Sequence, residues 1–99
     1  MRVLGIDPGI ARTGWGVVDA ENGKLRVESF GCIETSSQKE TYKRLEEIYT
    51  EILKLIKKYS PDEIAIEELF FNTNAKTAFV VGQARGVILL ACSQKNLDL

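Results

Sequence analysis

Leu4-Gly-Ile-Asp-Pro-Gly9 is a short apolar run that ends in an acid and a turn signal, and Ile64-Ala-Ile-Glu-Glu68 is a second run of this kind. Each pattern predicts a strand with a carboxylate, Asp7 or Glu67, at its carboxyl end. An acid contributes little to a sheet at this position but is well placed to bind a metal ion. If the two strands are neighbours, the chain contains half of a divalent-metal nuclease site.

The residues around the first run predict an antiparallel meander of three strands. The first strand covers residues 2–7, the second 13–19 and the third 24–34. Glu21-Asn-Gly23 is a strong hairpin turn between the second and third strands. Gly31 marks a candidate irregularity in the third strand.

The period of the apolar residues then changes from that of strands to that of a helix. Steps of three and four residues predict an amphipathic helix over about 40–59. A fourth strand follows over 63–67, with Glu67 on the face opposite its isoleucines. Because a helix precedes it, this strand should pair in parallel. Residues 75–94 predict a second helix that is apolar nearly all round.

The turn after the first strand has its own signature. Pro8 biases Asp7 toward extended geometry, and Gly9 is free to adopt positive φ. The alternative interpretation of Asp7 is therefore a turn residue that accepts local backbone hydrogen bonds. The alternative interpretation of Glu67 is a strand residue that faces solvent. From the spacing alone, these structural interpretations stand beside the catalytic ones.

Composition indicates one globular domain over residues 1–99 and excludes several kinds of catalyst. The chain is 44% hydrophobic and 27% charged, with a net charge of −1 and no histidine. Without histidine, Ser-His and Cys-His nucleophiles are excluded, and carboxylates with a metal remain. Cys32 and Cys92 lack zinc or redox spacing, so we expect two buried, reduced thiols. No apolar run approaches the about 20 residues of a membrane span, and no secretory signal is evident, so we expect a cytoplasmic protein.

Three motifs occur in order along the chain, and they carry a family resemblance. They are Gly5-Ile-Asp-Pro-Gly9 followed by Thr13-Gly14 and Gly16-Val17, Ala65-Ile-Glu-Glu68 followed by Phe70-Phe71 and Asn74, and Gly82-Gln-Ala-Arg-Gly86 in the second helix. In this order and spacing they resemble the RuvC family of Holliday-junction resolvases, and the order of elements resembles ribonuclease-H-like α/β folds. The first motif alone also occurs in actin-like folds, sugar kinases and a ribonuclease-H-like family that processes ribosomal RNA.

The resemblance implies a metal-dependent endodeoxyribonuclease that cuts two opposed strands of a four-way DNA junction in recombination and repair. It implies that Asp7 bridges two ions and that Glu67 binds one of them. Oxygen ligands of this kind suit Mg²⁺ or Mn²⁺. Two ions about 3.5–4 Å apart can activate a water and stabilise the leaving 3′ oxygen. Glu68 is the alternative to Glu67 as the metal ligand. We expect Glu68 instead to support the ligands without binding the metal, or to lie at the surface.

Four residues are candidates for contact with DNA. Phe70 and Phe71 follow the second acid, and the resemblance assigns base stacking at an opened junction to the position of Phe70. An aromatic packed back onto the helix is the alternative. Arg12 and Lys76 are candidates for phosphate contact. The net charge does not itself indicate DNA binding, and the lysines of the first helix alternate with glutamates, which predicts a solvated face of mixed-sign pairs.

The second helix is the expected dimer contact. The resemblance assigns it to a two-fold interface, and the small residues Gly82 and Gly86 would allow close approach of a partner. Arg85 belongs to the same run, and it fits an interfacial ion pair or a phosphate contact. The family resemblance also implies a branch-migration motor complex as a partner, and no membrane.

The expected site is incomplete in these 99 residues. The family completes its site with further carboxylates, or a carboxylate and a histidine, on a helix after a fifth strand, and the chain stops at Leu99. We therefore expect a C-terminally truncated nuclease domain that lacks the fifth strand and the C-terminal helices. The alternatives are a noncatalytic dimerising or DNA-binding module and a related nuclease that processes RNA. Nucleotide binding of the actin-like type is disfavoured, because one small lobe offers no second phosphate loop.

Overall fold

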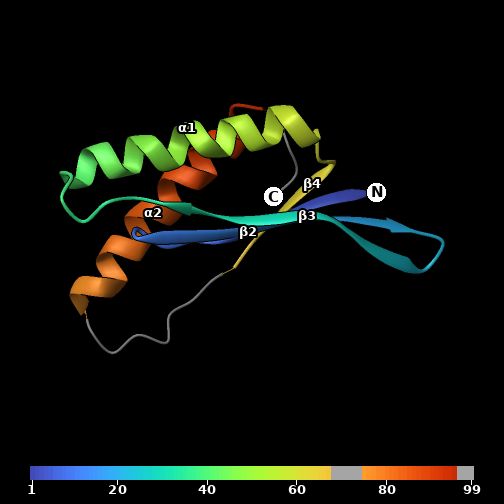
Figure 1. Ribbon diagram of the computed structural model, residues 1–99, viewed down its shortest axis with the longest axis horizontal. Helices are drawn as coiled ribbons and strands as arrows, with labels where there is room; N and C mark the ends of the chain where they lie inside the picture. The colour runs from blue at the N-terminus through green and yellow to red at the C-terminus, as the bar shows by residue number, and fades with distance from the viewer. Residues whose placement is uncertain (68–74, 96–99) are drawn as a thin grey trace.

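The computed structural model describes residues 1–67 and 75–95 (Figure 1). Within them the elements are β1 (Arg2–Asp7), β2 (Arg12–Glu21), β3 (Lys24–Glu34), α1 (Thr41–Tyr59), β4 (Glu63–Ile66) and α2 (Ala75–Ser93). The strands form one sheet in the order β3-β2-β1-β4. β4 is parallel to β1, and the other pairs are antiparallel. The predicted meander, crossover helix and parallel fourth strand are confirmed.

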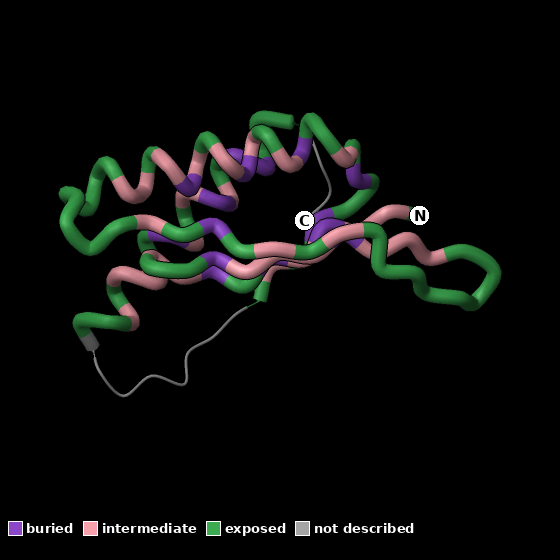
Figure 2. The backbone as a smooth tube through the Cα atoms, viewed as in Figure 1, coloured by how far each residue is buried: buried purple, intermediate pink, exposed green. Residues whose placement is uncertain are grey.

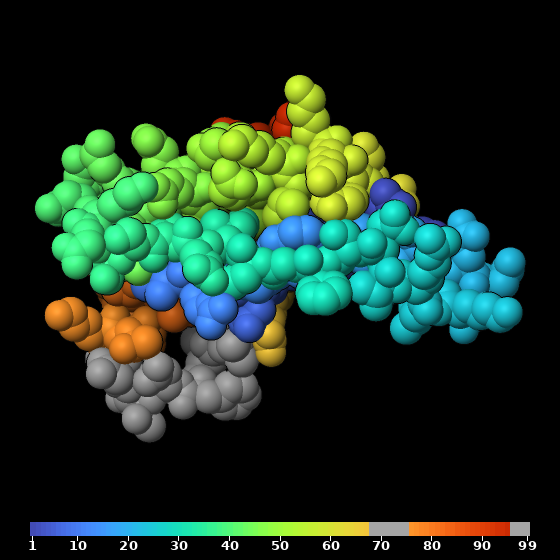
Figure 3. Space-filling view, in the orientation of Figure 1, coloured from blue at the N-terminus to red at the C-terminus, as the bar shows by residue number. Residues whose placement is uncertain are grey.

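The β2–β3 hairpin projects from one end of the molecule (Figure 3) and turns at two residues with positive φ. Asn22 has φ 51° and Gly23 has φ 76°, as a two-residue turn that follows the strand twist requires. The irregularity in this hairpin lies between Val17 and Val18. Because Val17 pairs with Ser29 and Val18 with Val27, the residue between these two partners is extra in β3.

Gly31 is not the site of that irregularity, so this prediction is wrong. Gly31 pairs in register with Trp15 on the neighbouring strand. A Cβ at Gly31 would lie 2.8 Å from Cζ2 of the indole, so the glycine provides space for the ring. Trp15 in turn lies 5.8 Å, centroid to centroid, from the Tyr59 ring at the end of α1. The glycine therefore helps to attach the sheet to the helix above it.

The core lies between one face of the sheet and the two helices (Figure 2). It contains Leu4, Ile6, Val17, Ile33 and Ile64 from the sheet, Ile48, Ile52 and Ile56 from α1, and Ala84, Ile88, Ala91 and Cys92 from α2. Side chains alternate across a strand, so Leu4 and Ile6 face this core while Gly5 and Asp7 face the other way. The ladder pairs keep this division across all four strands.

The opposite face of the sheet carries no buried side chain among the described residues. Phe30 is 80% exposed and Val27 is 63% exposed on this face. Cys32 also lies there, opposite Gly14, and it is exposed. The prediction of two buried thiols is therefore wrong for Cys32, because the two helices cover only the other face. Cys92, on α2, is buried as predicted.

Helix α1 presents a charged outer face, as its sequence predicts. Lys39 pairs with Glu47, and Lys54 pairs with Glu51. Such exposed pairs contribute little to stability, and they offer no continuous positive surface to DNA. Neither helix, as far as the structure describes it, is both long and apolar enough to cross a membrane.

Candidate active site

Two neighbouring strands bring Asp7 and Glu67 to one edge of the sheet. Ile6 pairs with Ile66 in the parallel β1–β4 ladder, and the Glu67 amide donates a hydrogen bond of 3.0 Å to the Ile6 carbonyl. Asp7 and Glu67 are the residues that directly follow this last pair. Both are exposed, and both line one open groove of about 410 Å³. The two acids therefore follow neighbouring parallel strands, as the sequence predicted.

The groove has a floor of small residues. Gly5, Gly14 and Ala65 line it on the face that the helices leave open. Gly14 pairs with Asp7, and a Cβ at Gly14 would lie 3.7 Å from the Asp7 Cβ. Ile6, Trp15 and Ile66 complete its lining among the described residues, and they belong to the core side of the sheet. At the two glycines, a ligand can approach the backbone closely. An open surface of this kind suits a large substrate better than an enclosed small molecule.

The loop after Asp7 is held by a buried threonine. Thr13 Oγ1 donates to the Gly9 carbonyl at 2.6 Å and accepts from the Gly9 amide at 3.4 Å. Gly9 does not use positive φ, although its sequence context allowed it. A glycine is needed for space instead, because a Cβ there would lie 2.3 Å from the Arg12 carbonyl oxygen. The loop therefore has little freedom to move Asp7.

A second support for this loop comes from residues that the sequence did not mark. Thr35 Oγ1 donates to the Ile10 carbonyl, and the Thr35 amide donates to the Ala11 carbonyl at 3.1 Å. Arg44 of α1 then donates from Nε to Thr35 Oγ1 at 2.9 Å. No local pattern identifies Thr35 or Arg44, because their partners lie far away in the sequence. They connect α1 to the loop that follows Asp7.

Arg12 stands beside the acidic groove on the open face. It begins β2 two residues before Gly14 and therefore shares the face of Gly14, the partner of Asp7. Its guanidinium pairs with the Glu34 carboxylate at 3.2 Å, and both side chains are mostly exposed. Hydrogen bonding to Cys32 and the neighbouring Glu34 raise the pKa of Arg12, so it stays cationic. An exposed pair of this kind exchanges readily for another anion.

The other candidates from the sequence lie elsewhere or outside the described residues. Lys76 is exposed in the first turn of α2, Arg85 is half-buried on the same helix, and neither lines the groove of the two acids. Gly82 and Gly86 are exposed, and an added Cβ would meet no atom within 4 Å at either. This leaves room at the surface of α2. Glu68, Phe70 and Phe71 lie outside the described residues.

The two carboxylates suit a hard divalent ion. Among residues 1–67 and 75–95, no three histidine, cysteine or acidic side chains gather as a ligand set. Mg²⁺ nevertheless commonly binds through one or two carboxylates together with water and substrate phosphate oxygens. Asp7 and Glu67 are accessible and supply only oxygen donors, so they fit Mg²⁺ or Mn²⁺ and not a thiolate-preferring metal.

Comparison with known proteins agrees with this arrangement. Residues 3–99 match the family model described as crossover junction endodeoxyribonuclease RuvC. The chain is 54% identical over its whole length to the RuvC of Caldicellulosiruptor saccharolyticus and 52% identical to that of Finegoldia magna, and it covers 60% of each. The chain thus spans about three fifths of the length of these curated relatives.

A solved structure shows the same fold. The RuvC of Thermus thermophilus, described in complex with a Holliday junction substrate, superposes with a TM-score of 0.91 at 34% identity. The match covers 98% of this chain and 62% of the Thermus chain. The predicted ribonuclease-H-like α/β fold class is confirmed.

Proposed function

We propose, because this chain belongs to the RuvC family of crossover junction endodeoxyribonucleases, that it provides the first two acids of a metal-dependent site that cuts four-way DNA junctions. The observation that carries the proposal is the placement of Asp7 and Glu67 side by side on an open, glycine-floored groove. Both acids are exposed, so metal ions held by them can meet a phosphate of a bound DNA strand.

Each residue has a separate task in this proposal. Asp7 and Glu67 would hold two Mg²⁺ or Mn²⁺ ions, with Asp7 as a ligand to both and Glu67 as a ligand to one. Bound ions would supply an activated water and neutralise charge at the leaving 3′ oxygen. Arg12 exchanges its exposed partner Glu34 for a DNA phosphate and so orients the backbone beside the acids.

Further DNA contacts come from the segment after Glu67 and from α2. Phe70, with Phe71 beside it, stacks on a base of the opened junction, a contact that is worth about 1–3 kcal/mol per base. Lys76 contacts phosphate near the start of α2. Glu68 is, in this proposal, not a metal ligand but an acid that supports the ligands or belongs to the surface.

The assembly we propose is a homodimer formed through α2. Gly82 and Gly86 offer the close approach that a helix–helix contact requires, and Arg85 lies between them. Two-fold symmetry would then place two sites on the two opposed strands of a symmetric junction. The protein would act in the cytoplasm together with a branch-migration motor complex.

The 99 residues belong, in this proposal, to one nuclease domain whose remaining metal ligands lie outside them. Two carboxylates bind a pair of ions loosely, because each ion keeps most of its water. The curated relatives are longer than this chain, which leaves room for a fifth strand and a helix that bears the other ligands. The activity therefore belongs to the full-length protein.

Asp7→Asn in the full-length protein tests the proposal. The amide keeps the shape of the side chain but loses the negative charge, so Mg²⁺-dependent cutting of a four-way junction should fall by about 100-fold or more, while junction binding persists. Single-turnover cleavage and electrophoretic binding assays measure the two effects separately.

Glu63→Gln is the matched control, because Glu63 is an exposed acid on β4 that does not line the groove. It should cut at the parent rate. Normal cleavage by Asp7→Asn, or an equal loss in Glu63→Gln, would remove the metal assignment.

A further inference from the structure

We infer that Asp62 is a positioning residue, which sets the register of β4 against β1 and thereby holds Glu67 beside Asp7. The inference rests on the proposed function in one respect, because it takes the two carboxylates to be metal ligands. Asp62 lies at the opposite end of the strands from those carboxylates, and it touches neither of them.

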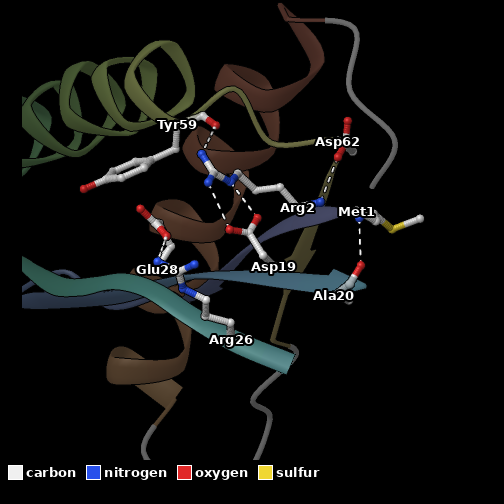
Figure 4. A network of polar contacts seen from close by, with 8 residues as sticks. All are labelled: Met1, Arg2, Asp19, Ala20, Arg26, Glu28, Tyr59 and Asp62. Atoms are coloured by element: carbon white, nitrogen blue, oxygen red, sulfur yellow. Dashed lines mark hydrogen bonds and ion pairs between the residues drawn. The ribbon is translucent and has the colours of Figure 1, made fainter. Parts of the chain in front are cut away.

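Asp62 makes two hydrogen bonds to the backbone of a single residue, Arg2 (Figure 4). Its Oδ2 accepts from the Arg2 amide at 2.7 Å, and its own amide donates to the Arg2 carbonyl at 2.8 Å. This pair of bonds directly precedes the first ladder pair, Val3 with Glu63. Asp62 therefore closes the start of the β1–β4 ladder.

The ladder needs such a constraint because it is short and its pattern is ambiguous. β4 has four residues, and the isoleucines at its second and fourth positions face the core. A slip of one residue would turn Ile64 and Ile66 toward the open face, so burial opposes it. A slip of two residues keeps both side chains on the core face. Burial alone therefore determines only the parity of the register.

A slip of two residues would destroy the metal site. A strand rises by about 3.3 Å per residue, so Glu67 would move by roughly 6.6 Å relative to Asp7 along the strand axis. Oxygen ligands lie about 2.0–2.1 Å from Mg²⁺, so two carboxylates that bind the same ion have oxygens within about 4.2 Å of each other, and the shifted Glu67 could no longer share an ion with Asp7. Either slip also breaks the bond that the Arg2 amide donates to the Asp62 carboxylate, which makes this bond specific for one register.

Arg2 is a firm anchor for this purpose. Its Nε and Nη2 donate to the two Asp19 carboxylate oxygens at 2.8 and 3.0 Å, and Nη1 donates to the Tyr59 carbonyl at 3.0 Å. Figure 4 shows the guanidinium between β2 and the end of α1. Arg2 is thus tied to β2, to α1 and, through its backbone, to Asp62. This network, Arg2 with Asp19, Tyr59 and Asp62, fixes β4 relative to the rest of the sheet.

The inference can be tested with three variants of the full-length protein. Asp62→Ala removes the carboxylate acceptor. Asp62→Asn keeps a side-chain oxygen that can accept from the Arg2 amide but removes the charge. Glu63→Ala removes the same charge from the next residue, which is exposed. Circular dichroism and the thermal midpoint establish that each variant is folded.

Two measurements report on the register and on the site. The first is amide hydrogen exchange of Glu67 without metal, because its N–H is bonded to the Ile6 carbonyl only in the native register. The second is the affinity for Mn²⁺, measured by electron paramagnetic resonance. Asp62→Ala should exchange this amide about tenfold faster and bind Mn²⁺ about tenfold more weakly. Asp62→Asn and Glu63→Ala should stay within about threefold of the parent protein in both measurements.

The result that would overturn the inference is a folded Asp62→Ala with parental Glu67 exchange. An Asp62→Asn as impaired as Asp62→Ala would also overturn it, because the effect would then come from charge and not from the hydrogen bond. If Asp7→Asn binds Mn²⁺ as tightly as the parent protein, or if the parent binds none, the proposed function fails. The Glu67 exchange would still decide the role of Asp62, since it needs no metal.

Discussion

Gly9→Ala should impair the site far more than its size suggests. The substitution adds one methyl group to the loop that follows Asp7. That methyl would lie 2.3 Å from the Arg12 carbonyl oxygen, whereas real Cβ atoms essentially never come closer than 3.0 Å. The backbone at Gly9 has no positive φ, so the expected effect comes from the steric contact and not from a left-handed conformation.

The size of the effect on stability and rate depends on which of the two contacting segments can move. Arg12 is paired with Glu34 in the β2–β3 ladder, so the loop that carries Gly9 must move instead. It must move by roughly 0.7 Å, and forced displacements of this kind cost about 1–3 kcal/mol of stability. Asp7 lies two residues away. Because a misplacement of about 1 Å at a reacting centre can cost about 100-fold in rate, we expect cleavage to fall roughly 30- to 100-fold.

Chemical denaturation and single-turnover cleavage of a four-way junction measure the two effects in the full-length protein. Gly16→Ala is the matched control, because its methyl would lie at an ordinary 3.9 Å from the Ser29 carbonyl oxygen and Gly16 does not line the groove. It should cost less than about 1 kcal/mol and leave the rate within a few-fold. If Gly9→Ala matches the parent in both stability and rate, the loop does not position Asp7. If Gly16→Ala is equally impaired, the loss comes from an added methyl group in β2 as much as in the loop, and the Gly9 contact is not its cause.

Two further predictions concern the ionisable groups. Cys92 is fully buried, and burial raises the pKa of its thiol to about 11, whereas Cys32 is exposed. A disulfide reagent at pH 8 should therefore label Cys32 quickly and Cys92 only after unfolding. Equal labelling rates would contradict this. The hydrogen bond from Arg2 lowers the pKa of Asp19 below its ordinary 3.8, so this ion pair stabilises the fold above that pH and loses its effect as the pH falls through the lowered value. Acid unfolding of Asp19→Asn should therefore depend less steeply on pH below about 4 than that of the parent, and identical curves would refute the coupling.

Local patterns predicted the elements of this fold well. Apolar alternation located the strands, and the three- and four-residue period located α1, which runs from Thr41 to Tyr59 against a predicted 40–59. Five element ends differed by one or two residues: β4, for example, stops at Ile66 and not at 67, and β2 reaches Glu21 and not 19. Ends depend on the hydrogen bonds of the last residues, which a period does not encode.

The predictions that failed each depended on a partner across the sheet. Gly31 was predicted to mark a bulge, but it leaves space for the Trp15 ring. The pairing register of β2 and β3 brings that ring beside it. Cys32 was expected to be buried, yet its burial depends on which face of the sheet the helices cover. A single stretch of sequence contains none of these distances.

The sequence by itself determined which residues can do chemistry. It placed Asp7 and Glu67 at the ends of two strands, and its motifs identified the family, because strand periodicity and motif spacing are local properties of the chain. Tertiary structure decided that the two acids share one open groove. The alternation of side chains repeats every two residues, so it cannot distinguish one register from another two residues away. Hydrogen bonds between distant parts of the chain, such as those of Asp62 with Arg2, are specific for one register.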